Sequence, residues 1–218
     1  MAKQIMIDPD QLRKQSEETF QNIPVNVYSK RMRDLRGEFT NQQLINIFYD
    51  MLSIRQFETM LQDLRLNGNF RGLAYNYSGP AHLCIGQESA AVGQAFGLDA
   101  NDFIFGTHRG HGELIAKGFA TLRKLDDAEL MQIMQAYGDG AQLKVVQRGF
   151  TGTVRELALR FYLYGIMAEI FGRENGFAKG LGNSMHAFFI PFGVYPNNAI
   201  VGGSAPIATG AALYKKIF

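Results

Sequence analysis

Two imidazoles and a guanidinium occur together in residues 107–112, which read Thr-His-Arg-Gly-His-Gly. The guanidinium of Arg109 can pair with two phosphate oxygens at once, and the rings of His108 and His111 can donate to an anion or move a proton. A diphosphate group is bound by side chains of these types, so we expect an anion site here. The alternative is a buried arginine that pairs with a carboxylate, such as that of Glu113.

A further histidine, His82, lies in residues 82–90 (His-Leu-Cys-Ile-Gly-Gln-Glu-Ser-Ala), between a Gly-Pro pair and a helix that begins with glycine. Its ring either satisfies a local hydrogen bond or faces a bound substrate. Cys84 is the only cysteine, so neither an intramolecular disulfide nor a thiolate zinc site can form. We expect Cys84 to be a small buried side chain in a protein of a reducing compartment.

Two segments rich in glycine follow, at residues 179–186 (Lys-Gly-Leu-Gly-Asn-Ser-Met-His) and 198–206 (Asn-Ala-Ile-Val-Gly-Gly-Ser-Ala-Pro). Each taken alone would be a plain turn. Loops on a rigid scaffold are also where ligands usually bind. We therefore treat both segments as candidate binding loops.

The scaffold begins with a helix that Thr40 caps, with Gln43 three residues later. Apolar residues recur in it at helical spacing and are expected to face the core: Leu44, Ile47, Phe48, Met51, Leu52, Ile54 and Phe57. Within residues 51–58, the pair Arg55 and Glu58 is expected on a solvated face.

More helices are expected over residues 86–96, 113–116, 126–137, 154–171 and 206–218, with a short buried strand over 103–105. That strand would present residues 107–112 at its carboxyl end, where Gly110 and Gly112 would leave room for a bulky anion beside the backbone.

Helices that alternate with short apolar strands favour the α/β class, and we expect a three-layer, mostly parallel sheet with helices on both faces. The strands are too few to complete it, so the domain is expected to be incomplete at its carboxyl end. We expect residues 1–40 to form an amino-terminal arm on a neighbouring subunit or domain. Residues 41–218 would form the partial domain, with a helical insertion near 121–160.

The bulk composition excludes several classes of protein. Apolar residues make up 46% of the 218 residues and charged residues 19%, which indicates a globular chain rather than a disordered one. The net charge of +2 comes without a clustered basic stripe, so no nucleic-acid partner is expected. No secretory signal or stretch of membrane-spanning length occurs, so we expect no membrane partner and a cytoplasmic location.

The order and spacing of the segments resemble the alpha-type chains of thiamine diphosphate-dependent 2-oxo acid and acetoin dehydrogenases, a family of oxidoreductases. The resemblance extends from about residue 40 to residue 218 and is carried by the segments 51–58, 82–90, 107–112, 179–186 and 198–206. It implies the thiamine diphosphate-binding fold. It also implies an enzyme that cleaves a 2-oxo acid, such as pyruvate, or acetoin and passes the acyl group to a lipoyl carrier.

The resemblance implies a role for each candidate residue. His82 and His111 would be catalytic and guide substrate and proton transfer, and His108 and Arg109 would contact the diphosphate. The aminopyrimidine ring would meet four residues, through main-chain groups or close packing: Ala199, Ile200, Val201 and Gly202.

The sequence departs from the family pattern at three positions of these loops. Leu181 and Asn183 stand where lysine and glycine are common, and Ala199 stands where glycine is common.

The family holds magnesium through a Gly-Asp-Gly turn that follows a strand, so we expect the metal ligands outside this segment and assign none within it. Residues 138–140 match those letters but follow a helical stretch, so we interpret them as a turn. The activating glutamate would come from a beta-type subunit or a fused second half. A lipoyl-bearing acyltransferase and a second copy of the chain are the other expected partners.

We therefore expect a truncated chain that is not a complete catalyst. Two other functions stay open: part of a transketolase-like carboligase, and a non-catalytic module for subunit interaction.

Overall fold

The computed structural model describes residues 8–15, 19, 22 and 27–218, and the chain divides into two units, Met1–Phe39 and Thr40–Phe218. In the first unit, the short helix α1 (Pro9–Leu12) and the 3-10 turn η1 (Met32–Leu35) are formed, and Lys30 pairs with Glu38. Part of the expected arm, including Pro24, lies outside the described residues. The expected contact of the arm with a neighbour stays a prediction.

Helix α2 (Asn41–Asn67) is the longest element, and the expected cap forms, since the Gln43 amide donates to Thr40 Oγ1 at 3.2 Å. Its packed face carries Asp50, Ile54, Phe57, Leu61 and Leu64, which follow one another at helical spacing.

The expectation that Phe48 and Leu52 face the core is wrong, because their side chains are 67% and 46% exposed. Both lie two residues from Asp50, about 200° around the helix, and so project from the opposite side.

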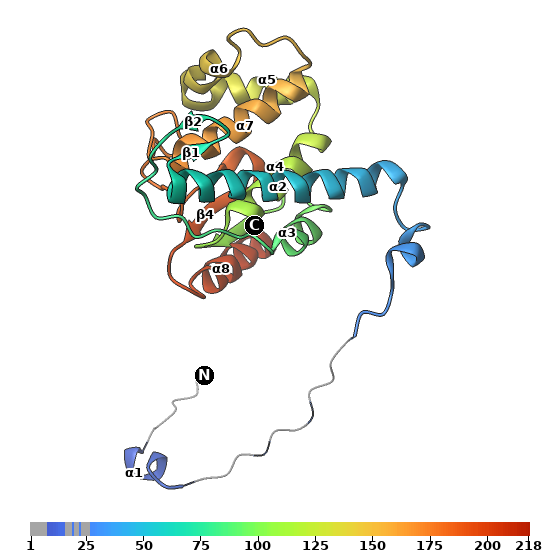
Figure 1. Ribbon diagram of the computed structural model, residues 1–218. Helices are drawn as coiled ribbons and strands as arrows, with labels where there is room; N and C mark the ends of the chain where they lie inside the picture. The colour runs from blue at the N-terminus through green and yellow to red at the C-terminus, as the bar shows by residue number, and fades with distance from the viewer. Residues whose placement is uncertain (1–7, 16–18, 20–21, 23–26) are drawn as a thin grey trace. The chain divides into compact units, whose positions relative to one another are not determined.

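Helices surround α2 on two sides (Figure 1). One group comprises α5 (Asp127–Ala136), the turn η2 (Tyr137–Gly140), α6 (Ala141–Val146) and α7 (Val154–Ile170). The other group includes α3 (Glu88–Ala95), and α4 (His111–Lys124) packs against α2, α3 and α7. Helices α3, α5 and α7 lie close to their predicted spans, and α4 extends beyond the predicted residues 113–116. Helix α6 was not predicted as a separate helix. Whether those near 121–160 are an insertion stays a prediction.

Helix α4 forms the centre of the core, and it is buried from His111 through Leu122 except for the half-buried Glu113. Gly118 permits the close contact with α7, since a Cβ there would lie 1.9 Å from the ring of Tyr162. The Tyr162 hydroxyl donates to the Leu114 carbonyl at 2.7 Å.

Strand β3 (Ile104–Thr107) pairs in parallel with β4 (Val194–Asn198), and β1 (Asn69–Phe70) forms a hairpin with β2 (Leu73–Ala74). The mixed α/β class is therefore confirmed, whereas the described residues contain only two-stranded sheets. The strand predicted over residues 103–105 forms over Ile104–Thr107 instead and is not fully buried: Phe103 is exposed, and Ile104 and Phe105 are half-buried. The pair β3–β4 has no further strand beside it in this part of the chain.

The 3-10 turn η3 (Ile190–Phe192) precedes β4, and helix α8 (Ser204–Ile217) follows it, close to the predicted span. None of the helices that the structure describes is both long and apolar enough to cross a membrane.

Candidate functional site

His111 lies at the centre of a buried network that joins four of the sequence segments. Its Nδ1 lies 2.7 Å from Oε1 of Glu58 on α2, and its Nε2 lies 2.9 Å from Oγ of Ser184. The other carboxylate oxygen of Glu58 accepts from the Cys84 amide at 2.7 Å. Because the side chains of His111 and Glu58 are fully buried, His111 reaches no solvent in this structure and holds the segments together.

The interpretation of Arg55 and Glu58 as a pair on a solvated face is wrong. Glu58 is fully buried, and Arg55 instead forms two hydrogen bonds with Glu88 of α3, at 2.6 and 3.0 Å. These bonds hold the pKa of the Glu88 carboxyl at about 2. The pair therefore fixes the start of α3 to α2.

Arg109 and His108 lie beside the segment that carries His82. The Arg109 guanidinium donates to the Leu83 carbonyl at 2.7 Å, and the rings of His82 and His108 are 5.3 Å apart, edge to face. Arg109 is exposed and its guanidinium donates to a main-chain carbonyl, so the alternative of a buried arginine paired with Glu113 is wrong.

Burial lowers the pKa of His82, and the nearby charges of His108 and Arg109 lower it further. Burial raises the pKa of Glu113, whose carboxylate accepts from the Thr107 amide at 3.3 Å. Both shifts favour the neutral forms. Cys84 is buried as expected, and burial followed by the charge of Glu58 raises its thiol pKa to about 12.

Glu169, near the end of α7, anchors the first glycine-rich loop. Its carboxylate is fully buried and accepts from four main-chain amides: Ala178 at 2.7 Å, Gly180 at 3.0 Å, Gly182 at 2.7 Å and Asn183 at 3.1 Å. The residue pattern alone does not identify Glu169 as part of the site. The only signal was a carboxylate in an otherwise apolar stretch of helix.

The second loop begins where β4 ends, beside the carboxyl end of β3, because Thr107 pairs with Asn198 across the parallel strands. The structure thus brings the segments 107–112 and 198–206 together. Ser204 Oγ donates to the Gly106 carbonyl at 2.6 Å and ties the start of α8 to the same edge.

The four expected aminopyrimidine contacts, residues 199–202, form a turn on this edge. The Ile200 amide donates to Asn198 Oδ1 at 2.8 Å, and the side chains of Ile200 and Val201 are 70% and 80% exposed. Their roles stay predictions.

The expectation that Gly110 and Gly112 leave room for an anion is wrong. A Cβ at Gly110 would lie 2.3 Å from Nδ2 of Asn197, and one at Gly112 would lie 2.8 Å from Sγ of Cys84. Side chains of the protein fill both spaces.

Two polar atoms beside this loop are buried and have no hydrogen-bond partner in the described part of the chain: Nδ1 of His108 and Nδ2 of Asn197. Such orphaned atoms are uncommon in folded proteins and point to a missing partner. The residues present therefore fit an anionic ligand at this edge.

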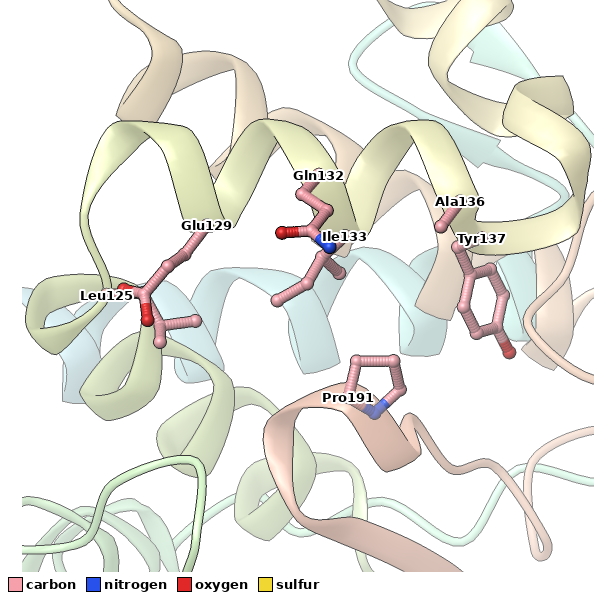
Figure 2. Close-up of a pocket in the computed structure, with 7 residues that line it drawn as sticks. All are labelled: Leu125, Glu129, Gln132, Ile133, Ala136, Tyr137 and Pro191. Carbon is pink, nitrogen blue, oxygen red and sulfur yellow. The ribbon is translucent and has the colours of Figure 1, made fainter.

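The crevice next to Arg109 has a volume of only about 40 Å³, lined by residues that include Cys84, Gln87 and Glu113. A larger cleft of about 430 Å³ lies between α5 and Pro191 (Figure 2). None of the predicted site residues lines it. Residues 107–112 thus form an open edge rather than an enclosed pocket.

The Gly-Asp-Gly sequence at residues 138–140 is a turn, as predicted, with positive φ at all three residues. No group of three or more His, Cys, Asp or Glu side chains that could hold a metal ion occurs among the residues described.

The family model of the dehydrogenase E1 component matches residues 74–158, which include His82, His108, Arg109 and His111. Curated relatives match over a longer span. The alpha subunit of the acetoin:2,6-dichlorophenolindophenol oxidoreductase of Bacillus subtilis is 32% identical over 177 residues, covering 81% of this chain and 38% of the relative. This chain is a relative of the alpha-type dehydrogenase E1 subunits.

Two more relatives of the E1 family support this result. The mitochondrial pyruvate dehydrogenase E1 alpha subunit of Chaetomium thermophilum is 30% identical. The match covers 82% of this chain and 31% of the relative. The corresponding acetoin subunit of Cupriavidus necator is 31% identical, with 80% of this chain and 38% of the relative covered. The chain thus spans less than two fifths of these E1 relatives, and no solved structure matches it.

Proposed function

We propose that this chain supplies the diphosphate-binding edge of a thiamine diphosphate site in a dehydrogenase E1 component. The observation that carries the proposal is the meeting of Arg109, His108 and the 198–206 loop at the carboxyl ends of two parallel strands, with two buried polar atoms left unpaired. Ligands of α/β proteins bind at such strand ends. The E1 names of the relatives point to the same cofactor.

Within this site, Arg109 is the main diphosphate contact, because its exposed guanidinium has donors beyond the one used on Leu83. His108 adds a second donor. The cofactor, when bound, supplies a nucleophilic carbon and an electron sink for cleaving the bond next to the substrate carbonyl.

The histidines have separate roles in the proposal. His82 faces substrate from its place beside His108 and Arg109, and the lowered pKa of its ring favours the neutral form, which can accept a proton. His111 is a positioning residue, because Glu58 and Ser184 hold both of its ring nitrogens. The turn at Ala199, Ile200, Val201 and Gly202 borders the aminopyrimidine.

The substrate is a 2-oxo acid or acetoin, and the acyl group passes to a lipoyl-bearing acyltransferase. The rest of the three-layer sheet, the magnesium ligands and the activating glutamate belong to segments outside residues 1–218, in this protein or in a beta-type subunit. Pairing with a second copy and a cytoplasmic location are parts of the same proposal. The single buried Cys84 suits a reducing compartment.

The test is calorimetric titration of thiamine diphosphate with magnesium into the complete protein, with Arg109→Ala and Arg148→Ala as matched variants. Arg148 is also exposed and lies in the turn after α6. Loss of a charge-assisted pair predicts affinity about 10- to 100-fold weaker for Arg109→Ala only. If both variants bind thiamine diphosphate with the same affinity, Arg109 does not contact the diphosphate.

The reaction is tested by reductive acylation of lipoamide from pyruvate or acetoin. Binding without acylation, but with ketose formation, would favour a transketolase-like carboligase. No binding under any metal condition would favour a module for subunit interaction.

A further inference from the structure

Asn197 occupies an irregular position in β4. Phe105 pairs with Tyr195 and Thr107 with Asn198, so Pro196 and Asn197 together face the single residue Gly106. Such a bulge redirects a side chain, and bulges are common next to binding sites. The Asn197 side chain is thereby turned over the loop that joins β3 to α4.

The side-chain amide of Asn197 lies along this loop from end to end. A Cβ at Gly106 would be 2.2 Å from Oδ1, and a Cβ at Gly110 would be 2.3 Å from Nδ2. His186 Nδ1 lies 2.9 Å from the Asn197 carbonyl and holds the main chain in place. Both glycines are therefore required by this one side chain.

Asn197 is only 3% exposed, and its Nδ2 has no partner among the described residues. Leaving a buried donor unpaired is costly, so an N–H group placed in this way requires an acceptor. His108 Nδ1, on the same loop, is also buried and unpaired.

The start of α4 lies at the same place, because Gly110 is its N-cap residue. No side chain within the described ranges caps this end, so the first-turn amides of a 14-residue helix and its dipole face the loop. A helix N-terminus with an unpaired amide beside it is an arrangement that suits an anion. Glu113 in the first turn is the nearby carboxyl group, and burial raises its pKa toward the neutral form.

We propose that Asn197 is a further anion-binding residue of this site, with its Nδ2 donating a hydrogen bond to the diphosphate that His108 and Arg109 hold. The inference rests on the proposed function and adds a contact that neither the loop pattern nor the resemblance assigns. A side-chain amide donates a hydrogen bond but carries no charge. Asn197 therefore contributes to binding without adding positive charge to the site.

The competing arrangement is internal. The opposite orientation of the amide would direct Nδ2 toward Gly106, where Glu113 Oε2 also lies within 2.7 Å of the Cβ position. A pair between Asn197 and Glu113 would satisfy the amide without a ligand.

The decisive variant is Asn197→Leu, which keeps the branched outline of the side chain and removes its polar atoms. In the complete protein, calorimetric titration with inorganic diphosphate and magnesium should show affinity at least about tenfold weaker than wild type. Thermal unfolding of the ligand-free variant should occur at the wild-type temperature or higher, because a buried unpaired donor has been removed. Asn197→Ala provides the same binding test if leucine does not fit. Asn41→Ala, at the exposed start of α2, is the control and should bind normally.

Unchanged diphosphate affinity in Asn197→Leu and Asn197→Ala overturns the inference. A second result would also overturn it: Asn197→Ala lowers the stability of the ligand-free protein, but has no such effect in a chain that already carries Glu113→Gln. That coupling would identify the internal pair between Asn197 and Glu113. If wild-type protein binds neither inorganic diphosphate nor thiamine diphosphate, the proposed function itself fails. The two failures are thus distinct.

Discussion

Replacement of Glu169 by glutamine tests whether its carboxylate holds the glycine-rich loop. Oε2 accepts from the amides of Ala178 and Gly180, and Oε1 accepts from those of Gly182 and Asn183. A glutamine has one oxygen, so two of the four amides would face an NH2 group instead. Hydrogen bonds to a charged group contribute roughly 1.5–3 kcal/mol each. Loss of two bonds therefore predicts a fall of about 3 kcal/mol in the free energy of unfolding. This value uses the low end of the range for each bond, because water can reach the edge of the loop.

Urea denaturation measures the total effect, and amide hydrogen exchange assigns it to residues. One pair of amides, either 178 with 180 or 182 with 183, should exchange much faster in Glu169→Gln. Glu174→Gln is the control, because Glu174 is an exposed carboxylate in the turn after α7, and a change below about 0.5 kcal/mol is expected there. The reasoning is refuted if all four amides keep wild-type exchange rates, or if both variants unfold at the same urea concentration.

Three other changes test the packing around the site. Gly110→Ala places a methyl group 2.3 Å from Nδ2 of Asn197, so the free energy of unfolding should fall by about 1–3 kcal/mol. Asn197→Gly in the same chain should recover most of it in thermal denaturation, and no recovery would show that the clash lies elsewhere. His111→Ala leaves the buried Glu58 carboxylate without its ring partner, at a cost of about 3–5 kcal/mol by urea denaturation, and full additivity with Glu58→Gln would contradict the pair. Burial lowers the pKa of Lys117 from 10.5 to about 8, so the unfolded chain binds more protons between these pH values and the free energy of unfolding should rise with pH across that window. The rise should vanish in Lys117→Met, and its persistence there would assign the titration to another group.

The helices were predictable because their start signals are local. Thr40 forms the expected reciprocal cap with Gln43, and Asp126 and Thr153 form the same kind of cap with a glutamate three residues later. The core face of α2 was less predictable, because the helix carries two apolar stripes. The local sequence does not show which stripe packs against the other helices. Phe48 and Leu52 belong to the stripe that does not.

The gathering of the site segments was predictable in outline, since parallel strands end at the same edge. The residues that hold them were not, because their partners are distant in the sequence. Glu58 contacts His111, 53 positions away, and Glu169 bonds main-chain amides that leave no trace in residue type. Glycines 106 and 110 show that space is needed, but only the structure shows that Asn197 fills it.

The bonds from Glu169 also have a consequence for the association of ligands with the loop at 178–183. When a flexible segment becomes ordered only on binding, the loss of its conformational entropy weakens the affinity. Here the anchoring carboxylate belongs to the same chain, so the loop is ordered when the core folds, before any ligand or second chain arrives. The four amides already donate to Glu169, so the loop can contact a ligand or partner only through its carbonyl oxygens and the exposed side chains of Lys179 and Leu181. A partner that docks on this loop meets a preorganised surface.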